Sequence, residues 1–243
     1  ARHQNFTSQE EEGRIIMGCG VSTKKGEGAE QPIVGSGTRQ ESKVELIKGP
    51  APEPVNVSAV QLVQCDNLLG EAPLWNHKES ALYWIDINGK KLWTWSGESG
   101  DSNSWDLPEV AGSFAFREKG SGFLMGFESG LAWYDPATQQ QDKICDYEPD
   151  LNTRPNDGKC DRSGNFVIGS YNKNHREDKE NIAGLWRLST SLKLEEILDY
   201  RFRCSNSIAF SKGGNLMYFC DTPTREIYRF TYSPKGKLSN KTL

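Results

Sequence analysis

The feature that most constrains this chain is an internal repeat. Residues 82–95 align without a gap on residues 217–230, so that LYWID falls on MYFCD and LWTW on IYRF. Two further copies lie between them, and the residues that open the apolar strand of each copy are spaced 41, 43 and 51 residues apart: Leu82, Phe123, Phe166 and Met217. A period of about 40 to 50 residues built only from strands and turns predicts an all-β fold, a β-propeller with one copy per blade. The alternative, an ordinary β-sandwich with irregular strands, has no reason to repeat its sequence in register.

The aromatic residues separate a tail from a folded region. Of 10 Phe, 7 Trp and 8 Tyr residues, only Phe6 precedes Trp75. Residues 13–54 instead carry Gly and Pro breakers, Ser, Lys and Glu, and such a composition buries too little apolar surface to offset chain entropy. We therefore expect residues 1–60 to be a disordered N-terminal extension and residues 61–243 to form a partial β-propeller of about four blades.

Charge, hydropathy and cysteine spacing exclude several classes. The net charge of −4 gives no general attraction for nucleic acid, and no run approaches the roughly 18 apolar residues of a membrane-spanning helix. We therefore expect a soluble, cytoplasmic protein with no nucleic-acid partner. The six cysteines are scattered without a CxxC pair, which favours buried free thiols, with a disulfide or two as the alternative.

One repeat position gathers side-chain oxygens. Counting back four residues from the end of the first strand of each copy gives Glu71, Gly112, Asn156 and Asn206. Because the first strand of each propeller blade lines the central channel, we expect these positions to converge at one mouth of it. Carboxylate and amide oxygens are the ligands that a hard cation such as calcium prefers, so three such residues in four copies favour a cation site. The alternative is that each Asn caps a turn through its own backbone.

Motifs for other hydrolytic chemistries are missing. The three histidines, His3, His77 and His175, form no HExxH pair, and the chain has no GxSxG or GxxxxGK[ST] sequence. Any hydrolysis is therefore expected to be metal-assisted. A polar insertion at 172–181 in the third copy is either a solvated loop or part of a binding face.

Several motifs then point to a family. They are LGEAPLW at 69–75, ALYWID at 81–86, RPNDGK at 154–159 and SNSIAFS at 205–211, the last followed by MYFCD at 217–221. In this order they resemble the regucalcin, senescence marker protein and gluconolactonase family from about residue 66 to the end of the chain. The resemblance implies a six-bladed β-propeller that holds one divalent cation on its axis and hydrolyses sugar lactones.

The resemblance also assigns site residues by motif. The metal ligands fall on Glu71 and Asn206, with calcium as the expected ion and zinc, manganese or magnesium as alternatives. The substrate-binding residues fall on four positions: Arg154, Asn156, Asp157 and, in the loop that follows, Asn174 or its neighbour Asn172.

The chain departs from the family in two ways. Ser207 stands where Gly usually follows the ligand Asn, and Gly tolerates backbone conformations that Ser does not. The family's third ligand, an Asp that is also its proposed general base, falls beyond Leu243, so no catalytic base is assigned. We therefore expect a fragment about two blades short of six, with exposed apolar edges and weak or absent activity.

The N-terminal region carries one lipidation pattern. Residues 17–22 (MGCGVS) match the myristoylation pattern, with Gly18 as the acylated residue, Cys19 as a palmitoylation site and two lysines nearby. Two acyl chains, or one chain with basic residues, give stable membrane attachment. This predicts a membrane partner only if Met17 is the true initiator, and the alternative is a coincidental match inside the chain.

The sequence thus predicts a metal-dependent lactonase, an enzyme whose partner is a small-molecule sugar lactone. The alternative is a non-enzymatic calcium-binding regulatory protein on the same propeller, and both functions use the same ligands. A propeller that serves only as a protein-interaction platform would leave the side-chain oxygens at the channel mouth without a purpose.

Overall fold

The computed structural model describes residues 15–16 and 58–243. Gly18 and Cys19 lie outside the described residues, as does most of the expected N-terminal extension, so acylation and disorder stay predictions. Residues 15–16 form a short strand, β1 (Ile15–Ile16), whose backbone pairs antiparallel with β6 (Ala111–Arg117). No helix in the described part of the chain is long and apolar enough to cross a membrane.

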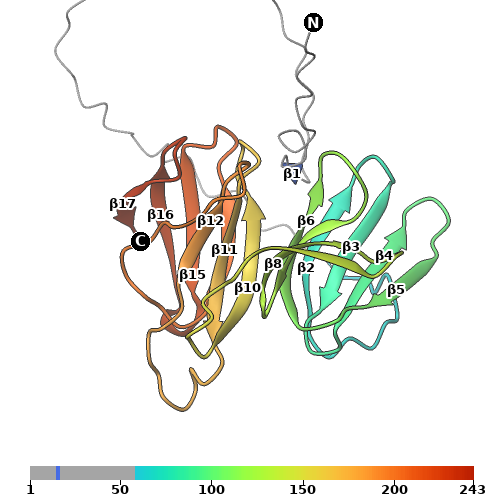
Figure 1. The fold of residues 1–243 in the computed structure, drawn as a ribbon, viewed down its shortest axis with the longest axis horizontal. Helices are drawn as coiled ribbons and strands as arrows, with labels where there is room; N and C mark the ends of the chain where they lie inside the picture. Colours follow the sequence, from blue (N-terminus) through green and yellow to red (C-terminus); the bar gives the residue numbers. More distant parts are fainter. Residues whose placement is uncertain (1–14, 17–57) are drawn as a thin grey trace, which may run out of the picture. The chain divides into compact units, whose positions relative to one another are not determined.

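Strands β2 to β17 form four antiparallel sheets in which each strand pairs with the next one along the chain (Figure 1). The first sheet consists of β2 (Gly70–Asn76), β3 (Ala81–Asp86), β4 (Lys91–Ser96) and β5 (Ser102–Asp106). The second consists of β6 (Ala111–Arg117), β7 (Phe123–Phe127), β8 (Gly130–Asp135) and β9 (Gln140–Cys145). The third consists of β10 (Thr153–Cys160), β11 (Phe166–Asn172), β12 (Leu185–Leu188) and β13 (Leu194–Glu196). The fourth consists of β14 (Ser205–Phe210), β15 (Leu216–Asp221), β16 (Glu226–Tyr232) and β17 (Leu238–Thr242), with a 3₁₀ turn at Thr222–Thr224 between β15 and β16. The all-β propeller architecture and its four repeats are thereby confirmed.

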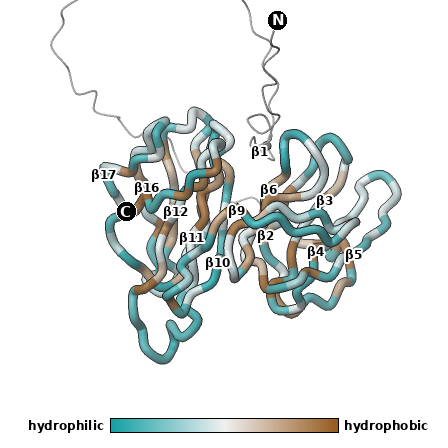
Figure 2. Tube along the Cα trace, in the orientation of Figure 1, coloured by the Kyte–Doolittle hydropathy of each residue, from teal (hydrophilic) through white to brown (hydrophobic). Residues whose placement is uncertain are grey.

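Alternating side chains of one strand serve two cores, which explains the continuous apolar runs. Phe114 and Phe116 of β6 pack against the first sheet, while Ala115 between them packs against the third. The same alternation places Val167 of β11 against the fourth sheet, and its neighbours Phe166 and Ile168 against the second. Three apolar clusters therefore join the four sheets in chain order, and a strand buried on both faces needs apolar residues at every position. In Figure 2 the apolar stretches lie mainly within the strands, whereas the loops are largely polar.

The fourth sheet shows the opposite pattern. Along β15 the residues alternate between buried and half-buried, since Met217 and Phe219 face the third sheet and Tyr218 faces away from it. Ile227 on β16 is 59% exposed. This face of the sheet is therefore less covered by the described residues than the face toward the third sheet.

The first strands of the sheets pack against one another in chain order, β2 with β6, β6 with β10 and β10 with β14. The sequence pattern does not predict where the fourth strand of each sheet lies. β9 and β17 are mostly exposed and polar, and they are held by backbone pairing rather than by burial. All cysteines among residues 58–243 are free, and one of them, Cys204, is buried. The other four are partly exposed: Cys65, Cys145, Cys160 and Cys220.

Candidate functional site

The predicted site residues lie where the first strand of each sheet is irregular. The pairing between the first and second strands shifts register at the site position or directly before it in all four sheets. The shifts fall between Glu71 and Leu74, Ala111 and Ser113, Pro155 and Gly158, and Asn206 and Ala209. Such a bulge bends the strand and changes the direction of its side chains. Ala72 and Ser207, which directly follow Glu71 and Asn206, both have left-handed φ values, of 53° and 58°. Ser207 thus holds a backbone conformation that favours glycine, as its departure from the family motif indicated.

A buried aspartate anchors the start of two of these strands. Asp86, at the end of β3, accepts hydrogen bonds from the backbone N–H of Leu69, two residues before Glu71, and of Leu68, both at 2.9 Å. Asp221, at the end of β15, accepts one from Cys204, two residues before Asn206, also at 2.9 Å. The repeat therefore uses the same carboxylate position to fix the backbone that presents each predicted metal ligand.

These hydrogen bonds also act on the Asp86 carboxyl. Burial alone raises its pKa, but the bonds from the backbone N–H groups of Leu69, Gly89 and Leu68 outweigh burial, so that the pKa lies below its ordinary value. N–H donors favour the ionised form of a carboxylate. Asp86 is therefore an ionised anchor of the strand that carries Glu71.

A hydrogen-bonded chain links the third sheet to the fourth. The Arg154 Nη1 donates to Asn156 Oδ1 at 2.8 Å, and Asn156 Nδ2 donates to the Ser205 carbonyl at 2.7 Å and, more weakly, to Asn206 Oδ1 at 3.4 Å. Asn206 Nδ2 in turn donates to Thr222 Oγ1 at 2.7 Å. Both Asn side chains thus bond across strands, in contrast to the alternative in which each only caps a turn.

Arg154 is held in place by stacking as well. Its guanidinium lies 4.4 Å from the ring centre of Tyr171, and the Tyr171 ring contacts the ring of His175, 4.9 Å away. Burial lowers the pKa of the Arg154 guanidinium, although nearby Tyr171 and other groups act in the opposite direction. An arginine remains charged despite such a shift, so Arg154 supplies a fixed positive charge.

Asp157 faces β14. Its Oδ2 accepts the backbone N–H of Ile208 at 2.8 Å. Burial raises the pKa of the Asp157 carboxyl, and the bond from Ile208 offsets only part of this shift. In this structure Asp157 therefore helps to join the third and fourth sheets beside the predicted site.

Gly112 completes the repeat position without a side chain, and packing explains why. A Cβ added to Gly112 would lie 2.1 Å from the Pro155 carbonyl oxygen and 2.7 Å from the Asn156 backbone nitrogen. The glycine lets β6 approach the backbone of β10 at the point where Asn156 begins its hydrogen bonds.

The side-chain oxygens of Glu71 and Asn206 are suitable ligands for part of a hard-cation site. The Glu71 carboxylate is exposed and accepts no hydrogen bond from another described residue, and it acts electrostatically on Arg154 and Asp157. From the described residues, Asn206 Oδ1 receives only the long bond from Asn156, which leaves it a lone pair. Among residues 15–16 and 58–243, no three His, Cys, Asp or Glu side chains are grouped so that they could hold a metal.

The inserted loop is ordered by its own hydrogen bonds. Buried Asn172 donates from Nδ2 to Asp178 Oδ1 at 2.9 Å and accepts the Asn174 backbone N–H at 2.9 Å. Lys173 forms a 2.7 Å ion pair with Glu128 of the second sheet. Asn174 itself is exposed, and its substrate contact stays a prediction.

Sequence reasoning missed three residues of this region, Tyr171, Cys204 and Thr222. Tyr171 and Thr222 occupy one repeat position, five residues after Phe166 and Met217, so an alignment of the copies could have singled out both. Cys204 gave no signal, because its sulfur is placed near Asn156 and Asn206 only by the packing of the sheets, at 4.0 and 3.6 Å.

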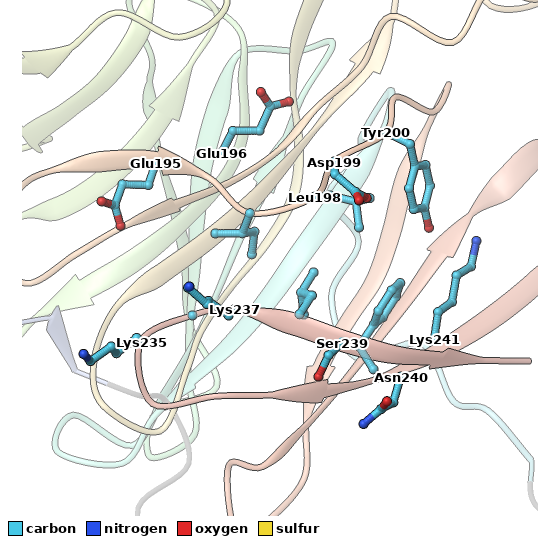
Figure 3. Close-up of a pocket in the computed structure, with 14 residues that line it drawn as sticks. Glu195, Glu196, Leu198, Asp199, Tyr200, Lys235, Lys237, Ser239, Asn240 and Lys241 are labelled. Carbon is cyan, nitrogen blue, oxygen red and sulfur yellow. The ribbon is translucent and has the colours of Figure 1, made fainter.

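Two crevices among the described residues lie elsewhere. One crevice, of 670 Å³, has two walls. β13 and the segment after it form one wall, with acidic residues, and β17 and the residues before it form the other, with lysines (Figure 3). Lys241 lies beside the Tyr200 ring there, 4.5 Å from its centre. Another, of 520 Å³, lies at the turns around His77 and Gly120. None of the predicted site residues lines either crevice.

Comparison with known proteins identifies the family. The model of the SMP-30/gluconolactonase/LRE-like region matches residues 69–243, and the chain therefore belongs to this family. It is 37% identical over 182 residues to L-arabinolactonase of Azospirillum brasilense, covering 75% of this chain and 60% of that protein. It is 32% identical to the putative sugar lactone lactonase YvrE of Bacillus subtilis (71% and 58% covered) and 27% identical to regucalcin of Danio rerio (72% and 59%). The chain spans about three-fifths of the length of these relatives.

A solved structure agrees on the fold. The calcium-binding protein regucalcin from Agrobacterium tumefaciens superposes with a TM-score of 0.68 at 24% identity, covering 75% of this chain and 61% of that one. At this identity the likeness establishes the propeller fold and no more.

Proposed function

We propose that the protein carrying this chain hydrolyses a sugar lactone with the help of a divalent cation. The observation that carries the proposal is the hydrogen-bonded set of Arg154, Asn156 and Asn206. Asn156 and Asn206 occupy one repeat position, and Glu71 stands at the equivalent position of the first sheet. Relatives named as lactonases support the substrate class.

Glu71 and Asn206 would hold the cation, and their oxygens suit calcium, with zinc, manganese or magnesium as alternatives. The bound cation would supply Lewis acidity, which polarises the lactone carbonyl. Calcium is the first ion to test, because carboxylate and amide oxygens are the ligands that it prefers.

Arg154 is the residue best placed to bind the substrate. Its Nη1 is occupied by Asn156 Oδ1 and the Pro155 carbonyl, so the other guanidinium donors are available for sugar hydroxyls or for charge that develops on the carbonyl oxygen. Asn156 fixes the direction of that guanidinium. In the reaction water adds to the carbonyl carbon, the ring ester C–O bond breaks, and the ring oxygen takes a proton to give the open-chain hydroxy acid.

The test compares Glu71→Gln with Glu98→Gln, which changes an exposed glutamate in a turn of the first sheet. We expect Glu71→Gln to reduce lactone hydrolysis by at least about 100-fold and Glu98→Gln to leave it unchanged. Equal activity of the two variants would sink the assignment.

A calcium-binding regulatory protein without turnover is the second candidate, supported by the regucalcin relatives. It predicts calcium binding that depends on Glu71 together with no hydrolysis of any sugar lactone. Cytoplasmic localisation, with membrane attachment through Gly18 and Cys19 as the alternative, also remains a proposal.

A further inference from the structure

One residue at the end of the second strand, or directly after it, lies beside the start of the first strand in each repeat. This residue comes five positions after the landmark of each copy, and the four are Ile87, Glu128, Tyr171 and Thr222. In three sheets its backbone N–H donates to the carbonyl two residues before the site position, from Ile87 to Leu69, from Glu128 to Val110 and from Thr222 to Cys204, at 2.8 to 3.0 Å. The fold thus holds this residue next to the start of the first strand.

The first and fourth sheets differ both in their site residue and in the side chain at this neighbouring position, and the two differences go together. In the first sheet the site residue is Glu71, whose carboxylate presents an oxygen on either side, and the neighbour Ile87 has no polar group. In the fourth sheet the site residue is Asn206, whose amide has an oxygen end and a nitrogen end. There the neighbour is Thr222, and its Oγ1 accepts a hydrogen bond from Asn206 Nδ2 at 2.7 Å.

The direction of the Asn206 amide follows from its neighbours. Arg154 can only donate and the Ser205 carbonyl can only accept, so their bonds of 2.8 and 2.7 Å fix which end of Asn156 is the nitrogen. That nitrogen faces Asn206 Oδ1, and therefore Asn206 Nδ2 must find its acceptor on the other side. Two acceptors lie there, Thr222 Oγ1 at 2.7 Å and Cys204 Sγ at 3.6 Å, and a neutral thiol is the weaker of the two.

We propose that Thr222 is a positioning residue: its hydroxyl holds the Asn206 amide nitrogen so that Oδ1 is turned toward the site. The orientation stands on the hydrogen bonds above. What the oxygen then binds, a divalent cation, rests on the proposed function.

The first test measures the orientation without metal or substrate. Hydrogen exchange of the Asn206 side-chain amide is followed by NMR, with its signals assigned by their loss in Asn206→Asp. Thr222→Val, which keeps the shape and removes the hydroxyl, is expected to speed exchange about fivefold, the effect of losing one ordinary hydrogen bond, while Thr222→Ser stays within about twofold of the unchanged protein. Thr231→Val is the matched control, because Thr231 Oγ1 also accepts an amide, Asn240 Nδ2 at 3.2 Å, on the outer strands. The proposal would be overturned if the Asn206 amide exchanged at the same rate in Thr222→Val as in this control. It would also be overturned if Thr222→Ser exchanged as fast as Thr222→Val.

The second test uses calcium titrated into the same samples. Thr222→Val should weaken calcium binding about fivefold in the Asn206 protein but less than about twofold in the Asn206→Asp background, because a carboxylate needs no orienting. Equal weakening in both backgrounds would contradict the positioning role. If the unchanged protein binds no calcium, the proposed cation site fails, and the exchange measurement alone decides the role of Thr222.

Discussion

Replacing Gly112 by alanine tests the packing that places Asn156. The added Cβ would lie 2.1 Å from the Pro155 carbonyl oxygen and 2.4 Å from its carbon. These are backbone atoms, which cannot turn aside as a flexible side chain can, so β6 and β10 must move apart. The φ of Gly112 is not positive, and the cost is therefore steric rather than conformational. Overpacking costs about 1 to 3 kcal/mol, and a clash with backbone belongs at the upper end of that range, about 3 kcal/mol.

Urea unfolding of Gly112→Ala and of the control Gly213→Ala measures this difference. A Cβ on Gly213 would meet only the Asn215 side-chain oxygen, at 3.3 Å, and we expect a change within about 0.5 kcal/mol. In thermal unfolding, a loss of about 3 kcal/mol corresponds to a Tm about 6 to 12 °C lower for a region of this size. Equal stability of the two variants would refute the close approach of β6 to β10.

Three further predictions concern the same strands. Ser207→Gly should raise the free energy of unfolding by about 0.5 to 1 kcal/mol, since it relieves a φ of 58°; urea unfolding measures it, and a loss of stability would contradict the strain. Asp86 has a lowered pKa, so its stabilisation is present above the pKa of the unfolded chain, about 3.9, and is lost as pH falls through the folded value. The difference in free energy of unfolding between the unchanged protein and Asp86→Asn should therefore decrease as the pH falls from 6 to 3. A difference that stays constant would contradict this. Asp157 has a raised pKa in the folded protein. The free energy of unfolding should therefore fall as the pH rises from the pKa of Asp157 in the unfolded chain to its pKa in the folded protein, and Asp157→Asn should remove this fall. Urea unfolding curves between pH 3 and pH 7 measure this pH dependence. A fall in stability that persists in Asp157→Asn would show that another group causes it.

The sequence was sufficient for the repeat, because the repeat depends on local patterns, and the same patterns predict the position of the site. Continuous apolar runs such as 123–127 exist because the strand is buried on both faces. The register shift begins at the same position of the first and fourth copies, and an alignment of the copies singles out the two residues at that position, Glu71 and Asn206.

The sequence was not sufficient where a contact joins two sheets or where burial plays no part. The polar strand β17 pairs through its backbone, which leaves no hydrophobic pattern to read. The bond from Asn156 to the Ser205 carbonyl joins residues 49 positions apart and exists only because β10 packs on β14. Thr222 lay at a repeat position, but a Thr after a strand carries no signal until its partner Asn206 is known.

The central claim is that the protein carrying this chain hydrolyses a sugar lactone in a reaction that needs a divalent cation. The most direct measurement is acid release from L-arabinonolactone and D-gluconolactone, followed in a pH-stat after chelation and after the addition of calcium, zinc, manganese or magnesium. We predict that chelation abolishes hydrolysis and that at least one of these ions restores it. Turnover that persists unchanged in the presence of chelator, or no turnover of either lactone with any of the four ions, would contradict the account.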